Sequence, residues 1–313
     1  MTFAFVFPGQ GSQSVGMFDA MLAARAEHPA VADTLAEASD VLKQDLTALI
    51  ASGPAETLGL TTNTQPVMLT AGVAMWRAWV AAGGGKPVVM AGHSLGEYAA
   101  LVAAGALAFA DALPLVRFRA QAMQEAVPVG TGGMAAILGL DDDAVRAACV
   151  QGAEGEVVEA VNFNAPSQVV IAGHQAAVAR ACDAAKALGA KRAVVLPVSA
   201  PFHSSLMRPA ATRLEGYLAD VAIAAPAIDV INNVDVTVEH DPAAIRRALV
   251  RQAAGAVRWV ETIRAMADRG VEHAVECGPG KVLTGMTKRI DGRVSGLAIF
   301  DPASLAQTLE TLA

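Results

Sequence analysis

Ser94 lies in a turn with one glycine two residues before it and another two residues after it, within the stretch PVVMAGHSLGEYAALVAAG that starts at residue 87. The apolar residues 88–91 predict a short strand before the turn, and the Ala- and Leu-rich residues after it predict a helix. A G-x-S-x-G sequence between a strand and a helix is typical of a nucleophile elbow, in which a strained turn presents a serine hydroxyl. The alternative is a glycine-lined turn with an incidental serine, and the flanking elements favour the nucleophile.

A serine that attacks a carbonyl needs donors for the oxyanion that forms. The backbone N–H of Leu95, at the start of the predicted helix, is the expected first donor. A second glycine-rich turn, PGQGSQ, follows a predicted strand at residues 3–7. It could cradle a phosphate, but it lacks the G-x-G-x-x-G spacing of a dinucleotide-binding fold. We favour the alternative, in which Gly9 and Gly11 let a backbone N–H approach the reacting centre.

The serine also needs a base, and the chain has six histidines. His203 follows a predicted strand and a turn fixed by Pro201, which suits a base presented to a cleft. The residues alone leave that role level with an ordinary surface histidine. His93 is adjacent to the serine, and we expect its side chain to point away from the hydroxyl in a structural role.

Arg117 and Arg119 lie in the next predicted helix, at residues 111–126. Residues two positions apart in a helix point to different faces, so at most one of these arginines faces the elbow. The spacing alone favours a solvated or ion-paired surface position for both.

Composition limits the class of protein. Of the 313 residues, 54% are hydrophobic and 17% are charged, which is typical of a globular enzyme and not of a disordered chain. The longest apolar stretches are interrupted by charges such as Arg77, so no membrane-spanning helix is expected. The net charge of −7 argues against general nucleic-acid binding.

The N-terminal residues MTFAFVFPGQ carry neither a basic region nor a cleavage site, so we expect no signal peptide. The three cysteines are scattered and odd in number, which favours a reducing compartment over a disulfide framework, and none has metal-ligand spacing. They are Cys149, Cys182 and Cys277.

The element pattern predicts two lobes. Residues 130–198 read as βαββαβ, the ferredoxin-like order, inserted between residues 1–129 and 199–313. The two flanking segments predict one larger lobe with a mostly parallel sheet covered on both faces. We expect a site in the cleft between the lobes. The small lobe has predicted strands at 134–140, 157–164, 168–173 and 191–198 and predicted helices at 142–150 and 175–190. The larger lobe has predicted helical stretches at 17–50, 63–82, 206–219 and 242–252 and strands at 3–7, 88–91, 230–234 and 272–277.

A series of motifs runs along the whole chain: FVFPGQGSQ, GHSLGEY, RFRAQAMQ, NFNAPSQVVIAG, PFHSSLM, VRQ…VRW and ECGPGKVLTGM. In this order they resemble the malonyl-CoA:acyl carrier protein transacylases of fatty acid synthesis. The resemblance implies an α/β-hydrolase-like core with an inserted ferredoxin-like subdomain, which coincides with the two predicted lobes. It also implies an acyltransferase that moves malonyl groups from malonyl-CoA to acyl carrier protein through a malonyl-serine.

By this resemblance Ser94 accepts the acyl group, and His203 is the general base that activates it. The main-chain carbonyl of Gln252 orients the imidazole, in place of the acidic third member of a triad. The residues that follow it, Ala-Ala-Gly-Ala, depart from the bulkier Tyr-Asn-Pro type of sequence common in the family.

The resemblance further implies that Arg119 pairs with the malonyl carboxylate, and that backbone N–H groups of Gln10 and Leu95 form the oxyanion hole. A fixed guanidinium suits a carboxylate that an acetyl group lacks. Phe202, next to the base, would narrow the acyl pocket against an α-methyl branch, so malonyl would be favoured over methylmalonyl.

The expected partners are malonyl-CoA and an acidic acyl carrier protein, with no metal or cofactor beyond the coenzyme A thioester, no nucleic acid and no membrane. We expect a cytoplasmic protein, and family precedent implies a monomer. Because this chain is also net acidic, carrier docking predicts a local basic rim. Its candidate residues are Lys191, Arg192, Lys281, Lys288 and Arg289.

Other functions remain open at this point. A serine thioesterase or hydrolase would use the same elbow but admit water to the acyl-enzyme. A noncatalytic or dinucleotide-binding protein could be built on FPGQGSQ. Within malonyl transfer, the carrier could belong to polyketide synthesis or to a malonate decarboxylase.

Overall fold

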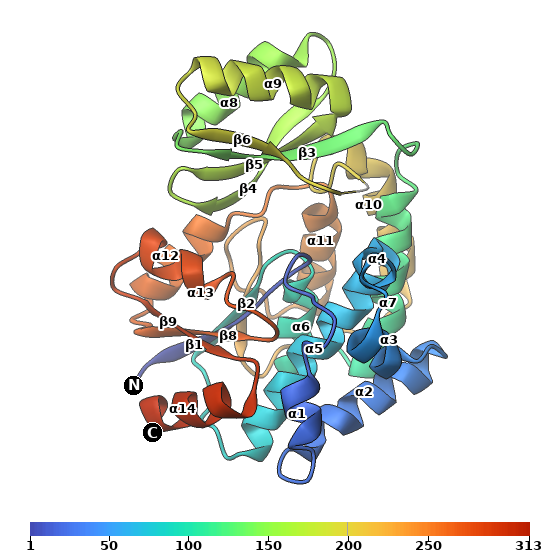
Figure 1. The fold of residues 1–313 in the computed structure, drawn as a ribbon, viewed down its shortest axis with the longest axis vertical. Helices are drawn as coiled ribbons and strands as arrows, with labels where there is room; N and C mark the ends of the chain where they lie inside the picture. The colour runs from blue at the N-terminus through green and yellow to red at the C-terminus, as the bar shows by residue number, and fades with distance from the viewer. Residues whose placement is uncertain (199) are drawn as a thin grey trace.

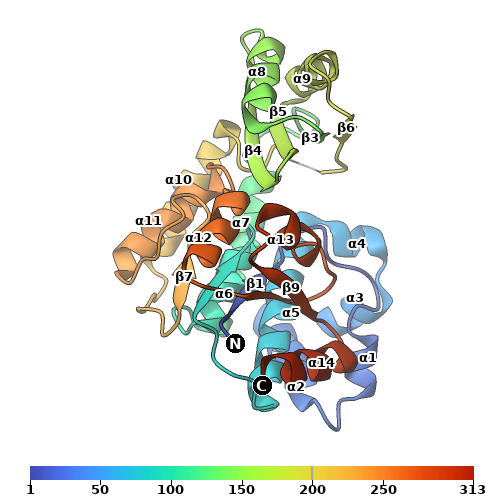
Figure 2. The same cartoon turned by 90° about the vertical axis from the view of Figure 1, so that its left-hand side faces the viewer.

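The structure is a computed structural model that describes residues 1–198 and 200–313. A large lobe holds a parallel sheet between helices, and a small lobe with its own antiparallel sheet lies above it in Figure 1. The view turned by 90° in Figure 2 shows the same two lobes, with both chain ends on the large one. The predicted α/β fold with an inserted ferredoxin-like unit is confirmed.

The sheet of the large lobe has five parallel strands in the order β7-β2-β1-β8-β9. All five residues of the central strand β1 are buried, as expected for a strand covered on both faces. The bounds are β1 (Phe3–Phe7), β2 (Val89–Gly92), β7 (Asp229–Ile231), β8 (His273–Cys277) and β9 (Ser295–Ile299).

Side chains alternate along β1, so its two faces build two cores. Its phenylalanines, at positions 3, 5 and 7, share one core with residues of α5 (Thr61–Ala81), α6 (Gly96–Ala103) and α7 (Phe109–Gln124). Ala4 and Val6 face the opposite way, toward α12 (Trp259–Asp268) and α13 (Thr284–Ile290). The elbow strand β2 pairs with β1 in the sheet, so its two faces are packed in the same two cores.

The remaining helices of the large lobe are mostly short and lie around this sheet (Figure 2). They are α1 (Asp19–Ala23), α2 (Pro29–Leu42), α3 (Leu46–Ser52), α4 (Ala55–Gly59), α10 (Arg208–Ala219), α11 (Pro242–Ala253) and α14 (Pro302–Leu312), with a 3₁₀ turn at Ser205–Met207. The helices α12 and α14 and the strand β9 have no counterpart in the sequence-based expectation.

Two helix predictions need correction. Residues 17–50 form three helices, because Pro29 starts α2, Lys43 ends it in a left-handed conformation and Asp45 caps α3. The next helix, α5, begins at Thr61, two residues before the predicted start at residue 63, and it encloses Pro66. Most of α5 is buried, and this packing outweighs the one hydrogen bond that a proline cannot donate.

The small lobe has the predicted βαββαβ order and an antiparallel sheet in the order β4-β5-β3-β6. Helices α8 and α9 cover the face that points away from the large lobe in both views. The bounds are β3 (Gly132–Leu138), α8 (Asp142–Ala153), β4 (Val158–Ala165), β5 (Gln168–His174), α9 (Gln175–Ala187) and β6 (Arg192–Val195). The predicted boundary at residue 199 lies outside the described residues.

Strand β4 joins the lobes through its main chain. The N–H of Phe163 donates to the carbonyl of Val257 at 3.0 Å, and the N–H of Val257 donates to the carbonyl of Val161 at 2.8 Å. A hydrophobic cluster that includes Met134, Val170, Phe202 and Met207 fills the junction between the small sheet and the large lobe. The lobes thus meet along one side of the elbow.

Candidate active site

Ser94 lies between the end of β2 at Gly92 and the start of α6 at Gly96. Its φ of 53° is left-handed, a conformation that L residues other than glycine rarely adopt. A Cβ on Gly92 would lie 1.8 Å from the carbonyl carbon of Gly96, and one on Gly96 would lie 2.0 Å from the carbonyl oxygen of Phe7. Only glycines fit at these two positions, so the sequence pattern reflects a steric requirement of the turn.

Asn233 holds this turn from the loop after β7. The N–H of Ser94 donates to Asn233 Oδ1 at 2.6 Å, and Asn233 Nδ2 donates to the carbonyl of Gly92 at 2.6 Å. The asparagine side chain therefore stabilises the strained backbone on both sides of the serine.

His203 Nε2 lies 2.6 Å from Ser94 Oγ. The other ring nitrogen, Nδ1, lies 3.0 Å from the carbonyl oxygen of Gln252 and 3.2 Å from that of Gly255. Because both carbonyls can only accept, Nδ1 carries the ring proton and Nε2 is free to accept the serine proton. The structure thus brings the predicted serine, histidine and glutamine together.

Burial and the positive charge of Arg119 lower the pKa of His203 to about 3. The imidazole is 5% exposed, so its charged form loses solvation. His203 is therefore neutral at neutral pH, which is the form that accepts a proton.

Arg119 is 2% exposed and lies beside the serine. Its Nη2 donates to Ser94 Oγ at 3.3 Å and to Gln252 Oε1 at 3.0 Å, and its Nη1 donates to Gln65 Oε1 at 2.8 Å. The surface position that helical spacing favoured for this arginine is wrong, because its face of α7 is the one that packs on the elbow. Arg117 points elsewhere, toward the carbonyl of Leu42 and the side chain of Gln44.

Gln10 and Leu95 both line the pocket at Ser94. Within residues 1–198 and 200–313, neither N–H has a hydrogen-bond acceptor. The loop that carries Gln10 approaches the elbow closely, since a Cβ on Gly9 would lie 2.6 Å from the carbonyl oxygen of His93. The two N–H groups are therefore free to donate, and their role in the oxyanion hole stays a prediction.

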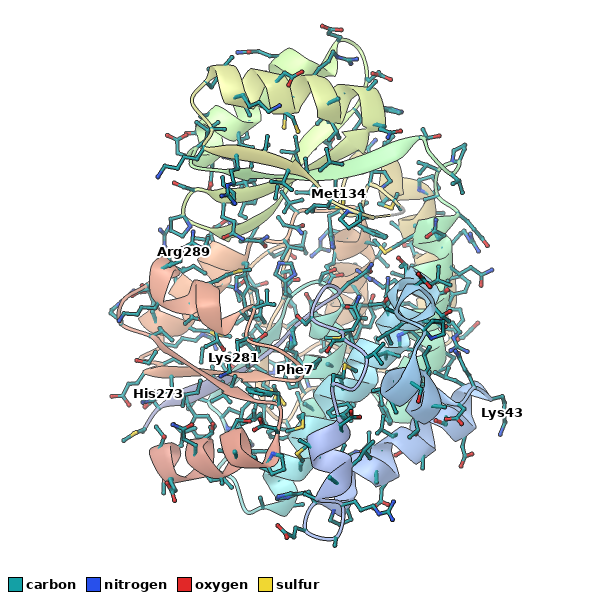
Figure 3. All side chains as sticks on the ribbon, viewed as in Figure 1. Phe7, Lys43, Met134, His273, Lys281 and Arg289 are labelled. Carbon is teal, nitrogen blue, oxygen red and sulfur yellow. The ribbon has the colours of Figure 1, made fainter. Side chains whose placement is uncertain are left out.

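The pocket at Ser94 has a volume of about 380 Å³ and draws its walls from both lobes. Met134, labelled in Figure 3, contributes from β3, and Phe202 contributes from the junction. His93 is held beside this pocket by a hydrogen bond of 2.8 Å from its Nε2 to Asn164 Oδ1 on β4, and burial lowers its pKa. His93 is therefore tied to the small lobe, whereas His203 carries the contact to the serine.

Sequence reasoning missed several residues whose polar side-chain or main-chain groups surround the serine: Gln65, Glu97, Asn233 and Gly255. Glu97 and Asn233 stand inside or beside motifs that were recognised, GHSLGEY and the polar end of the strand at 230–234. Their types signal hydrogen bonding, but their partners lie far away in sequence. Gly255 contributes only its carbonyl, so its side chain could give no signal.

The five candidate basic residues are exposed, at the start of β6 and around α13. Arg289 spans the lobes, since its Nη1 donates to Gln168 Oε1 at 2.9 Å (Figure 3). Lys281 lies over the ring of Phe300, with its Nζ 4.9 Å from the ring centroid. The side chains of Lys191, Arg192 and Lys288 have no such contact to other described residues, so these three candidates are the most available to a partner.

No cluster of three or more His, Cys, Asp or Glu residues suited to a metal ion occurs within residues 1–198 and 200–313. Over the same part of the chain, no helix has both the length and the apolar character required to cross a bilayer.

Comparison with known proteins gives consistent matches. The family model of the acyl transferase domain matches residues 4–292. The malonyl CoA-acyl carrier protein transacylase of Salmonella typhimurium is 57% identical over 98% of this chain and 98% of its own length. That of Haemophilus influenzae is 54% identical over 99% of both chains.

Solved structures of malonyltransferases also match this chain. An acyl-carrier-protein S-malonyltransferase from Burkholderia pseudomallei is 66% identical, with a TM-score of 0.96 over 99% of this chain and 100% of its own. A malonyl-transacylase solved in complex with a type II polyketide synthase acyl-carrier protein is 52% identical, with a TM-score of 0.97 over 99% of this chain and 100% of its own.

Proposed function

The chain belongs to the malonyl CoA-acyl carrier protein transacylases of the acyl transferase domain family, and from this premise we infer that it moves malonyl groups from malonyl-CoA to an acyl carrier protein in fatty acid synthesis. The observation that carries the mechanism is the 2.6 Å contact of Ser94 Oγ with His203 Nε2, beside a buried Arg119. This arrangement combines a nucleophile, a neutral base and a fixed cation in one pocket.

In the first half-reaction, Ser94 Oγ attacks the thioester carbonyl while His203 Nε2 takes the hydroxyl proton. The negative charge that forms on the carbonyl oxygen is held by the N–H groups of Gln10 and Leu95. When the C–S bond breaks, His203 returns the proton to the departing coenzyme A thiol. The malonyl group is then an ester of Ser94.

In the second half-reaction, the phosphopantetheine thiol of the carrier protein attacks this ester. His203 accepts the thiol proton and returns it to Ser94 Oγ as the C–O bond breaks. The chemistry uses only protein groups and the thioester, so no metal or further cofactor takes part in the proposal. The carbonyl of Gln252 keeps the imidazole oriented in both half-reactions.

Arg119 is the substrate-binding residue for the malonyl carboxylate. Its Nε is buried and has no hydrogen-bond partner among the described residues, so the guanidinium retains donor capacity. A carboxylate that enters the pocket would gain charge-assisted hydrogen bonds, which an acetyl group cannot form. Phe202 lines the same pocket and would crowd an α-methyl branch. Equal turnover of malonyl-CoA and methylmalonyl-CoA would contradict that role of Phe202.

For the whole protein, we propose a cytoplasmic monomer in which residues 1–129 and 199–313 form the catalytic subdomain and residues 130–198 the ferredoxin-like one. Carrier docking is assigned to the basic rim, because its residues lie on both lobes. Lys191 and Arg192 belong to the small lobe and Lys281, Lys288 and Arg289 to the large one.

A serine thioesterase is the second candidate, since the same elbow and histidine could pass the acyl group to water. The buried cation beside Ser94 favours an acidic acyl group but does not itself exclude water. Because a related malonyl-transacylase was solved in complex with a polyketide carrier, a polyketide acyl carrier protein is a second candidate partner. Rates of transfer to a fatty acid carrier and to a polyketide carrier would separate these two.

The test is the intact mass of the protein after brief incubation with malonyl-CoA, beside Ser94→Ala. A malonyl-sized gain on the unmutated protein alone, discharged by carrier protein, is the expected result. A gain that decays in buffer at the same rate without carrier indicates a thioesterase. Absence of any gain, with retention of a nicotinamide nucleotide, would instead support the dinucleotide-binding alternative on FPGQGSQ.

A further inference from the structure

Glu97 is a buried carboxylate, 2% exposed, in the first turn of α6 behind the nucleophile. Its Oε2 accepts from Gln252 Nε2 at 2.9 Å and from the N–H of Asn233 at 2.8 Å. Both partners also bind the elbow, since Gln252 Nε2 donates to the carbonyl of Ser94 at 2.9 Å and Asn233 Oδ1 accepts from its N–H. One carboxylate oxygen thus anchors two residues that hold Ser94.

The same glutamine connects Glu97 to the buried cation. Gln252 Nε2 donates to Glu97, and Gln252 Oε1 accepts from Arg119 Nη2 at 3.0 Å. The side-chain acceptors of Arg119 are the neutral oxygens of Gln65, Gln252 and Ser94. Glu97 is therefore the carboxylate that is linked to the guanidinium, through the amide of Gln252.

Several titratable and charged groups surround Glu97, and only some of them affect the charge of its carboxylate. The titratable and charged groups that face it or border its surroundings are Tyr98 on α6, Arg119 on α7, Asp235 and Glu239 after β7, Arg251 on α11, and His93 and His203 at the elbow. Of these, Asp235 is ion-paired with Arg251. Arg119 is thus the main favourable charge for an ionised Glu97, and burial opposes that form and raises its pKa to about 7.

A second, small cavity borders Glu97, and Ser94 is not among its lining residues. It has a volume of about 10 Å³, roughly the space for one water. Its lining includes Glu97, Asn232 and the half-buried Glu239.

We propose that Glu97 is a positioning residue that supplies the counter-charge of Arg119, and that the carboxylate of an acidic acyl-CoA replaces this charge, so that Glu97 takes up a proton when the substrate binds. The inference rests on the proposed binding of malonyl at Arg119. A substrate carboxylate adds a second negative charge near the buried cation, which disfavours the ionised form of Glu97 and raises its pKa further.

Because malonyl binding raises the pKa of Glu97, the direction in which affinity changes with pH is fixed. Well below the pKa of Glu97 in the free protein, its carboxyl is already neutral and binding of malonyl requires no proton. Between that pKa and the higher pKa in the complex, binding takes up part of a proton on average, so affinity for malonyl-CoA falls as pH rises through this range and levels off above it. A shift of about one pKa unit on binding makes affinity about tenfold weaker at high pH than at low pH. Acetyl-CoA has no carboxylate and shows no such loss.

The first test is calorimetric titration of Ser94→Ala, which binds but cannot be acylated, with malonyl-CoA and with acetyl-CoA. Measurements in two buffers of different ionisation enthalpy at pH 7.5 give the protons taken up. We expect about half a proton more for malonyl-CoA than for acetyl-CoA, for a shift of about one unit from pKa 7. The shared phosphates cancel in this difference. Equal proton uptake, with tighter binding of malonyl-CoA, would overturn the proposal.

The second test uses Glu97→Gln, whose amide oxygen can accept the same two hydrogen bonds without a charge. The KM for malonyl-CoA of the unmutated protein should rise severalfold between pH 6 and pH 8.5 relative to that for acetyl-CoA, while the variant shows a flat ratio. At pH 8.5 the variant should have the lower KM for malonyl-CoA. A variant that retains the pH dependence of the unmutated protein contradicts the proposal.

Glu276→Gln is the matched control. Glu276 is a fully buried carboxylate on β8 whose Oε2 accepts from the N–H of Thr284 at 2.8 Å, and it has no described contact to Arg119. Its variant can lose stability but should retain the pH dependence of KM. Should the unmutated protein fail to form a malonyl adduct, the proposed function fails; should the adduct form without the proton difference, only this inference fails.

Discussion

The carbonyl oxygen of Gln252 lies 3.0 Å from Nδ1 of His203, so the base of this site is oriented by the main chain and not by a carboxylate. A carboxylate would stabilise the charged imidazole and raise its pKa, whereas a neutral carbonyl does so only weakly. Burial then dominates, and the pKa of His203 is lowered to about 3 in the free protein. This difference has a measurable consequence for the pH dependence of acylation.

We expect the rate of acylation of Ser94 at saturating malonyl-CoA to stay constant as pH falls from 8 to well below 6.5, the ordinary value for histidine. The base works in its neutral form, which persists at every pH above its lowered pKa and is lost only below it. Rapid-quench measurement of the malonyl adduct by mass gives the rate. An acid limb with a midpoint at or above 6.5 would show that the pKa is not lowered in the complex.

Replacement of Arg119 by Ala should lower kcat/KM for malonyl-CoA by roughly tenfold to a hundredfold, the range for loss of a hydrogen bond to a charged group. Activity on acetyl-CoA should rise relative to that on malonyl-CoA, because the charge-assisted hydrogen bonds that only malonyl forms with the guanidinium are lost. Competition between the two thioesters, followed by adduct mass, measures the ratio. Arg117→Ala is the matched control, since that side chain contacts Leu42 and Gln44 away from the site. An unchanged preference for malonyl in Arg119→Ala would contradict its assigned role.

Gly92→Ala should destabilise the protein by several kcal/mol or prevent folding, since the added Cβ would lie 1.8 Å from the main chain of Gly96. Gly216→Ala is the control, because Gly216 lies within α10 and a Cβ there has no neighbour within 4 Å. That variant should gain about 0.5–1 kcal/mol from helix propensity. Urea unfolding measures both. Equal stability of the two variants would mean that the elbow tolerates a side chain.

Charge reversal in the basic rim should slow transfer to the carrier and leave acylation by malonyl-CoA unchanged. Lys288→Glu on α13 should lower the second-order rate of transfer severalfold at low ionic strength, and added salt should reduce the difference. Lys43→Glu is the control, since Lys43 is exposed on the side of the molecule opposite Arg289 in Figure 3. If both variants transfer to the carrier at the same rate at low salt, the rim is not the docking surface.

Local patterns in the sequence predicted the parts of the fold that depend on local geometry. The elbow was readable because its two glycines are steric requirements: a Cβ on Gly92 would clash within the turn, and one on Gly96 would clash with the end of β1. The βαββαβ order of the small lobe was readable because its strands and helices alternate with clear turns. The split of residues 17–50 into three helices was missed, although Pro29 and Asp45 are ordinary start signals.

The polar network around the serine could not be read in the same way. Helical spacing cannot say which face of α7 meets the elbow, so it left Arg119 on the surface. Glu97 meets Asn233 and Gln252 across 136 and 155 residues of sequence. Such contacts depend on how distant elements pack. The resemblance to known motifs identified only those residues of the network that carry out the chemistry.

The attachment of the small lobe through β4 limits how this architecture can vary. The strand contacts Val257 by its main chain and His93 by the side chain of Asn164, and the wall of the pocket continues from the same sheet. A one-residue slip of β4 would turn Asn164 away from the elbow and bring its neighbour in its place. Chimeras that exchange residues 130–198 between relatives would therefore succeed or fail on the register of this one strand, however well their helices match.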